Sequence, residues 1–122
     1  MRKNRIEESH QVALVGWFRI QYPALEDLLF IIANGENVGP FRMARLKKMG
    51  LVPGMPDLML SIARKPYHGL YIEMKRPDGH LQKNQVELHA ELKAQDYHVV
   101  TAYGWDEAKM FLKEYLQLPK WR

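Results

Sequence analysis

Apolar and polar positions change period several times along the first half of the chain, and each change predicts an element. Residues 6–22 are rich in apolar positions and predict a helix, which ends at Pro23 because proline disfavours helical backbone in the residue before it. The short apolar run 28–32 predicts a buried strand. Residues 41–49 predict a basic helix, and Gly50 follows in the position that favours a left-handed cap.

The second half predicts five further elements. Residues 57–62 and 70–75 are short apolar runs and predict strands, residues 81–95 a helix, 97–102 a strand and 105–116 a last helix. The order is therefore helix, strand, helix, strand, strand, helix, strand, helix. This order indicates an α/β fold with a small mixed central sheet flanked by helices, in which the long third helix makes a crossover connection.

Size and composition limit what the chain can be. Its 122 residues predict one domain, residues 1–122, with a core at about 6–117 and a frayed tail from Pro119 onward. Eighteen basic against fourteen acidic residues give a net charge of +4, which favours an anionic partner without deciding its identity. Cysteine is absent, which excludes disulfides and thiolate metal sites. No signal peptide or membrane helix is evident, so we expect a cytoplasmic location and no membrane partner.

Two acidic residues and one lysine are the strongest candidates for chemistry. Asp57 opens one predicted strand after Pro56, while Glu73 and Lys75 lie on the next. Side chains alternate along a strand, so Glu73 and Lys75 share a face, and pairing of the two strands would bring Asp57 to them. Two carboxylates beside an ammonium group suit a divalent cation that activates water against a phosphodiester. The alternatives are a turn aspartate after proline and a salt bridge along the strand.

Further residues stand around this trio in a fixed order. They are Glu7 and Gln11, Asn34-Gly35, Gly54-Met55-Pro56-Asp57, the stretch from His68 to Lys75, Gln85, and Gly104-Trp105. The ordered set resembles the PD-(D/E)xK nuclease superfamily and, within it, the virus-type replication-repair nuclease (VRR-NUC) family, over nearly the whole chain. The resemblance implies a restriction-endonuclease-like core and a DNA endonuclease that depends on Mg²⁺ or Mn²⁺.

The resemblance also implies roles for individual residues. Asp57, Glu73 and the backbone carbonyl of Met74 would bind the metal, and Lys75 would orient or deprotonate the attacking water. Gln85 would face the active site. Its position in the sequence agrees, since it interrupts an apolar helical stripe and a buried amide there needs a partner. An amide at a partly wet helix edge is the alternative reading of Gln85.

The family's first helix carries an acid that completes the metal site. Glu7 fits that pattern because Gln11 follows it at the spacing of one helical turn. Glu8 is the alternative candidate and falls on another face of the helix. Both acids also fit a structural purpose, since acidic residues at a helix N-terminus complement the helix dipole.

Nucleic-acid contacts are predicted at three places. Arg42, Arg45 and Lys48 lie on the predicted basic helix, where they would contact phosphates or simply form a solvated face. Arg76 follows the predicted strand at residues 70–75 and is a candidate for a phosphate contact. Asn34 would touch substrate or make the turn at Gly35.

Three functions are compatible with these residues. The first is a structure-specific endonuclease that cuts branched DNA as a homodimer, because stand-alone family members resemble Holliday-junction resolvases. It would act in DNA replication or repair in a bacterial or phage-infected cell. The second is a sequence-specific restriction-type nuclease, for which 122 residues leave little room. The third is a non-catalytic DNA-binding module. The intact carboxylate and lysine set favours the first.

Overall fold

The computed structural model describes residues 5–35 and 38–122. Its elements follow the predicted order, with one addition, the short 3₁₀ helix η1. In chain order they are α1 (Arg5–Gln21), η1 (Pro23–Leu28), β1 (Leu29–Ile31), α2 (Pro40–Lys48), β2 (Leu58–Leu60), β3 (Leu70–Lys75), α3 (Lys83–Ala94), β4 (His98–Tyr103) and α4 (Trp105–Leu116).

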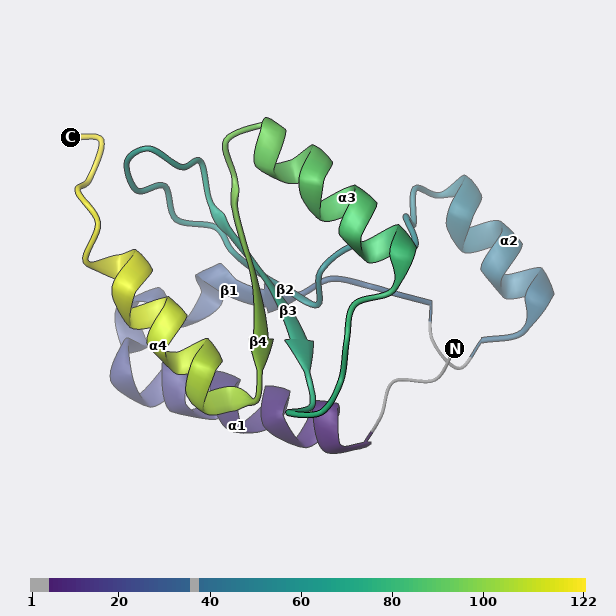
Figure 1. Cartoon of the computed structure of the whole chain (residues 1–122), viewed down its shortest axis with the longest axis horizontal. Helices are drawn as coiled ribbons and strands as arrows, with labels where there is room; N and C mark the ends of the chain where they lie inside the picture. The colour runs from purple at the N-terminus through teal and green to yellow at the C-terminus, as the bar shows by residue number, and fades with distance from the viewer. Residues whose placement is uncertain (1–4, 36–37) are drawn as a thin grey trace.

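The four strands form one mixed sheet in the order β1-β2-β3-β4. β1 pairs with β2 and β2 with β3 in antiparallel fashion, while β3 and β4 are parallel. The parallel pair requires a crossover, and α3 supplies it, as Figure 1 shows. The predicted α/β class, with a small mixed central sheet flanked by helices, is confirmed.

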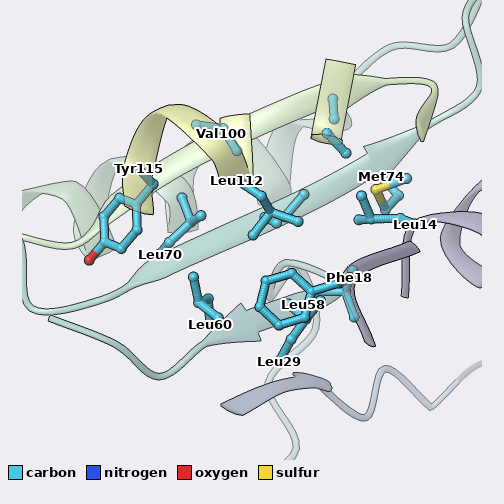
Figure 2. Packing of buried hydrophobic residues seen from close by; sticks show 13 residues of the cluster. Leu14, Phe18, Leu29, Leu58, Leu60, Leu70, Met74, Val100, Leu112 and Tyr115 are labelled. Atoms are coloured by element: carbon cyan, nitrogen blue, oxygen red, sulfur yellow. The ribbon is translucent and has the colours of Figure 1, made fainter. Parts of the chain in front are cut away.

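The two faces of the sheet carry different kinds of side chain. On β3, Leu70, Ile72 and Met74 are fully buried on the face covered by α1 and α4. Figure 2 shows Leu14 and Phe18 from α1 and Leu112 and Tyr115 from α4 packed over this face. Burial of such side chains stabilises the fold by roughly 1.5–3 kcal/mol each, relative to exposure. This face therefore holds the apolar core.

The opposite face of β3 carries Tyr71, Glu73 and Lys75, and α3 lies over it. The alternation predicted from the sequence is thus correct, but both faces of β3 are buried. A strand that is central in the sheet and covered on both sides places its polar residues in a setting of low dielectric constant, where they interact strongly.

Two local expectations were wrong. β2 begins at Leu58, so Asp57 precedes the strand and does not open it. The tail is not frayed: Pro119 accepts a hydrogen bond from the Lys65 backbone at 2.8 Å, and the Trp121 indole donates to the Tyr67 carbonyl at 3.2 Å. Among the described residues, no helix is both long and apolar enough to cross a membrane.

Candidate active site

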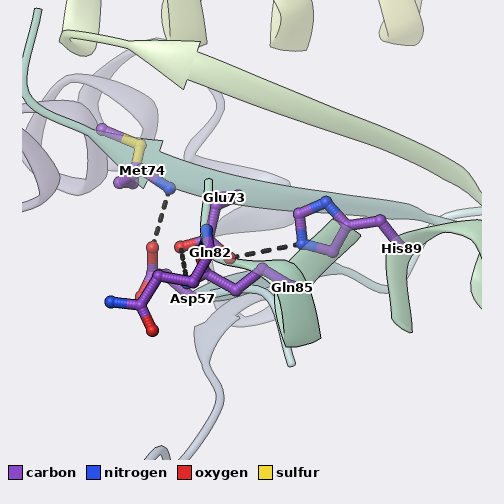
Figure 3. Close-up of polar contacts among 6 residues, drawn as sticks. All are labelled: Asp57, Glu73, Met74, Gln82, Gln85 and His89. Atoms are coloured by element: carbon purple, nitrogen blue, oxygen red, sulfur yellow. Dashed lines mark hydrogen bonds and ion pairs between the residues drawn. The ribbon is translucent and has the colours of Figure 1, made fainter. Parts of the chain in front are cut away.

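Three ionisable side chains are buried where β2 and β3 meet. Asp57 is 8% exposed, Glu73 2% and Lys75 7%. The antiparallel register pairs Leu58 with Ile72, so the residue before β2 lies beside Glu73 and Met74. The sequence therefore predicted correctly that strand pairing brings Asp57 to Glu73 (Figure 3). Burying charges is costly, and even a paired buried cluster adds little net stability, so stability does not explain this one.

Asp57 is held by the backbone of the neighbouring strand. Its Oδ2 accepts a hydrogen bond of 2.7 Å from the N–H of Met74. β2 starts at Leu58, one residue after Asp57. The Asp57 carboxylate therefore takes the place of a backbone strand partner for this N–H. The N–H and C=O of one strand residue point to the same side. The Met74 carbonyl is therefore directed to the Asp57 side, whereas the Lys75 carbonyl accepts from Gly104 on the opposite side.

Gln85 reaches Glu73 from the first turn of α3. Its Oε1 accepts from the backbone N–H of Gln82 at 2.9 Å, which caps the helix, and its Nε2 lies 3.3 Å from Glu73 Oε2. A backbone N–H only donates, so the capping contact fixes which end of the amide is oxygen. The amide nitrogen must then donate to the carboxylate. The buried partner expected for Gln85 is Glu73.

His89 is a site residue that the sequence did not identify. It is the buried residue of α3, and its Nε2 lies 3.4 Å from Glu73 Oε1. Burial lowers the pKa of His89, Lys93 and Lys75 lower it further, and Asp57 partly opposes the shift. The imidazole is therefore mostly neutral near pH 7. The available signal was its spacing of four residues from Gln85, which places both on one helix face.

A cleft of about 550 Å³ opens over these residues. Glu7, Asn34 and Arg76 line it together with Asp57, Glu73, Lys75 and Gln85, so the structure gathers most of the predicted site. Glu8 is exposed and does not line the cleft. Gly54 forms part of the wall with a φ of +93°, and a Cβ there would lie 3.0 Å from the Asn84 carbonyl oxygen at the start of α3.

The predicted nucleic-acid contacts divide into two groups. Arg76 and Asn34 line the cleft, while Arg42, Arg45 and Lys48 are exposed on α2 outside it. α2 borders the cleft through Met43, and no residue of this helix is buried. Its nine residues hold four cations and no acid. The helix is thus a basic element that lies to one side of the sheet (Figure 1), and Met43 places it next to the cleft.

Comparisons with known proteins identify the family. The model of the VRR-NUC domain matches residues 7–106. A solved structure titled "VRR_NUC domain protein" is 29% identical, with a TM-score of 0.83 over 97% of this chain and 93% of that one. Among curated proteins, none matches the chain. The chain belongs to the VRR-NUC family. It is accordingly a nuclease-type module that processes DNA, and the resemblance inferred from the sequence is confirmed.

Charge in the VRR-NUC cleft is unbalanced. Among the described residues, four carboxylates line it, from Glu7, Asp57, Glu73 and Asp78, against the cations of Lys75 and Arg76. Arg76 Nε pairs with Asp78 Oδ1 at 2.9 Å near the cleft rim. The lining residues therefore carry two more negative than positive formal charges. Such an excess suits one divalent cation and, in its absence, raises the cost of the buried carboxylates.

The donor atoms of the VRR-NUC cleft fit a hard cation. Within residues 5–35 and 38–122, no three His, Cys, Asp or Glu side chains form a closed metal cluster. Mg²⁺ does not need one, because it binds through one or two carboxylates and completes its shell with waters and substrate phosphates. Asp57 and Glu73 supply two carboxylates, and the Met74 carbonyl faces the same edge. The residues present therefore fit Mg²⁺ or Mn²⁺ better than a metal that requires nitrogen or sulfur ligands.

Proposed function

We propose that this VRR-NUC domain is a metal-dependent DNA endonuclease that uses Mg²⁺ or Mn²⁺. One observation carries the proposal: Asp57, Glu73 and Lys75 are buried together on the wall of one cleft. Asp57, Glu73, the Met74 carbonyl and Glu7 would hold the cation. When bound, such a cation supplies a more acidic water and offsets the negative charge that builds on the phosphate during hydrolysis.

The chain's own residues would orient the reactants. Lys75 shares a strand face with Glu73, so its ammonium group is directed to the same part of the cleft and is suited to position the attacking water or the scissile phosphate. Gln85 holds one oxygen of Glu73 and would keep that carboxylate in a fixed rotamer. Both effects fix geometry before reaction, and such positioning is one of the ways in which enzymes lower the barrier to reaction.

The preferred DNA is branched, and the active form is a homodimer. The basic helix α2 beside the cleft and Arg76 in its lining would contact phosphates, and such contacts position DNA without reading its sequence. A two-fold dimer would present two clefts to the two strands of a junction. We expect this activity in the cytoplasm of a bacterial or phage-infected cell, in DNA replication or repair.

The test is a cleavage panel of four-way junction, flap, duplex and single-stranded DNA, each with Mg²⁺, Mn²⁺ or EDTA. We expect metal-dependent cutting that is strongest on branched DNA. Lys75→Met, which keeps the length of the side chain but removes its charge, should lower the rate by about 10²- to 10⁴-fold. Lys113→Met, on the exposed surface of α4, is the matched control and should cut like wild type.

The outcomes separate the alternatives. Junction binding without cutting in either metal would contradict the enzyme proposal and favour a non-catalytic DNA-binding module. Cutting restricted to one duplex sequence would instead indicate a restriction-type nuclease. Undiminished cutting by Lys75→Met would show that the active site lies elsewhere.

A further inference from the structure

Two side chains of one helix approach the two oxygens of the Glu73 carboxylate, and of these two contacts only that of Gln85 is a regular hydrogen bond. Gln85 Nε2 lies 3.3 Å from Oε2, and His89 Nε2 lies 3.4 Å from Oε1. Gln85 and His89 are four residues apart on α3, so they project from the same helix face one turn apart. Figure 3 shows the carboxylate between the two side chains.

His89 is not explained as a packing residue. It is 5% exposed, and among the described residues its Nε2 makes no hydrogen bond of regular geometry. Its nearest polar partner is Glu73, at a distance slightly longer than the usual 2.7–3.2 Å. An apolar side chain at this position would avoid the cost of burying an imidazole. A buried polar group with one loosely held partner therefore calls for a role linked to that partner.

We propose that His89 is a positioning residue for Glu73: together with Gln85 it fixes the carboxylate in the orientation that binds the cation. This inference rests on the proposed metal role of Glu73. An ionised carboxylate has about four acceptor positions on its two oxygens. Gln85 donates to Oε2 and His89 lies beside Oε1, so both contacts limit the rotation of the carboxylate that would bind the metal. Partners of metal ligands act in this way, by limiting the orientations of the ligand.

The proposal requires a particular tautomer. A neutral imidazole has one N–H, and the nitrogen without it only accepts. Glu73 as a carboxylate also only accepts, so the proton must be on Nε2 of His89. The Nε2–H tautomer is thus the form in which the 3.4 Å contact is attractive, and it gives a spectroscopic signature for the role.

The test is Mn²⁺ binding to the DNA-free protein, measured by calorimetry and independent of cleavage. His89→Leu keeps an apolar side chain of moderate size and removes the donor, and we expect it to weaken Mn²⁺ binding by about 10- to 100-fold. His89→Gln restores an N–H donor of similar reach and should recover most of the affinity. His68→Leu, at an exposed position outside the cleft, should bind Mn²⁺ like wild type.

Two readouts separate positioning from folding. His89→Leu should still unfold in one cooperative transition in EDTA, which shows that it is folded, while removal of the donor beside the buried Glu73 carboxylate should lower its melting temperature. Nitrogen NMR of wild type should show the proton of His89 on Nε2. The proposal would be overturned if folded His89→Leu bound Mn²⁺ as tightly as wild type or more tightly. The imidazole would then have no effect on metal binding or would oppose it.

Failure of the metal site gives a different pattern. If Glu73→Gln binds Mn²⁺ as tightly as wild type, Glu73 is not a ligand, and both proposals fall. If Glu73→Gln loses binding but His89→Leu does not, only the positioning role of His89 is wrong. Mn²⁺ binding that depends on both residues, in a protein that cuts no DNA, would support His89 and overturn the endonuclease proposal alone.

Discussion

Asp57 has two separable roles, one in the backbone of the sheet and one in the chemistry. Its Oδ2 accepts from the Met74 N–H at 2.7 Å, a short and charge-assisted bond at a site that is 8% exposed. Asp57→Ala removes the acceptor and leaves this N–H without its present partner. Leaving a buried donor unsatisfied costs about 1–3 kcal/mol, so the free energy of unfolding should fall by that amount. In a protein of this length the melting temperature should fall by about 4–12 °C.

Asp57→Asn is the matched variant. The amide oxygen still accepts from Met74, while the negative charge beside Glu73 disappears from a cleft with excess negative charge. The neutral amide makes a weaker hydrogen bond, which lowers stability, while the loss of repulsion from Glu73 raises it. The stability of Asp57→Asn in EDTA should therefore stay within about 1 kcal/mol of wild type. Asn should therefore be clearly more stable than Ala. In contrast, both variants lose a metal ligand, and both should cease to cut DNA.

Urea unfolding in EDTA and in Mn²⁺ measures both roles. Wild type should gain about 2.7 kcal/mol at Mn²⁺ concentrations a hundredfold above its dissociation constant, and neither variant should gain as much. If Asp57→Ala is as stable as Asp57→Asn in EDTA, the hydrogen bond to Met74 contributes nothing, and the reasoning from strand geometry is refuted. If either variant keeps the full Mn²⁺ stabilisation, Asp57 is not a ligand.

Three further predictions concern stability. Gly54→Ala should cost about 1–3 kcal/mol in thermal unfolding because of the positive φ and the short contact, whereas Gly16→Ala, at an open position of α1, should stabilise by about 0.5–1 kcal/mol. Tyr115→Phe removes a 2.7 Å hydrogen bond to the Ile62 carbonyl and should cost about 1 kcal/mol in urea unfolding; no change would mean that water replaces it. Burial lowers the pKa of His98, so the unfolded chain binds a proton at this residue more readily than the folded chain does. The contribution of His98 to the free energy of unfolding should be full above about pH 6.5 and should fall below it. This loss should be smaller in His98→Phe.

Element type was predictable where the period of the sequence was long and undisturbed. The strand at residues 70–75 and the helix at 105–116 have the predicted bounds, because an apolar strand run and an amphipathic helix each show their own period. η1 was missed, since six residues that begin with a proline carry too little periodicity to distinguish a 3₁₀ helix from a loop. The tail was judged from its position in the chain, whereas its backbone and indole hydrogen bonds depend on the fold.

Site residues were predictable as far as strand pairing determines them. Prediction of this site required only the period-two alternation of a strand and the pairing of two strands, and the structure has both. It gave the residues Asp57, Glu73 and Lys75. His89 required knowledge of how α3 is rotated over the sheet. The apolar stripe through Gln85 suggested that leucines face the strands, but His89 is the buried residue of the helix. Which residue of α3 faces the sheet depends on how the helix packs, and a single sequence does not specify that packing.

α3 links the topology of the sheet to the geometry of the cleft. β3 and β4 are parallel, so the chain must cross back over the sheet, and the crossover covers the face that carries Glu73. The helix begins beside the end of β3 that leads into the cleft, and the same Gln85 side chain that caps its first turn also donates to the carboxylate. A shift of the helix start would therefore alter the cap and the candidate ligand together. This coupling explains why a glutamine is used at a half-buried position where leucine would favour the helix and the core more.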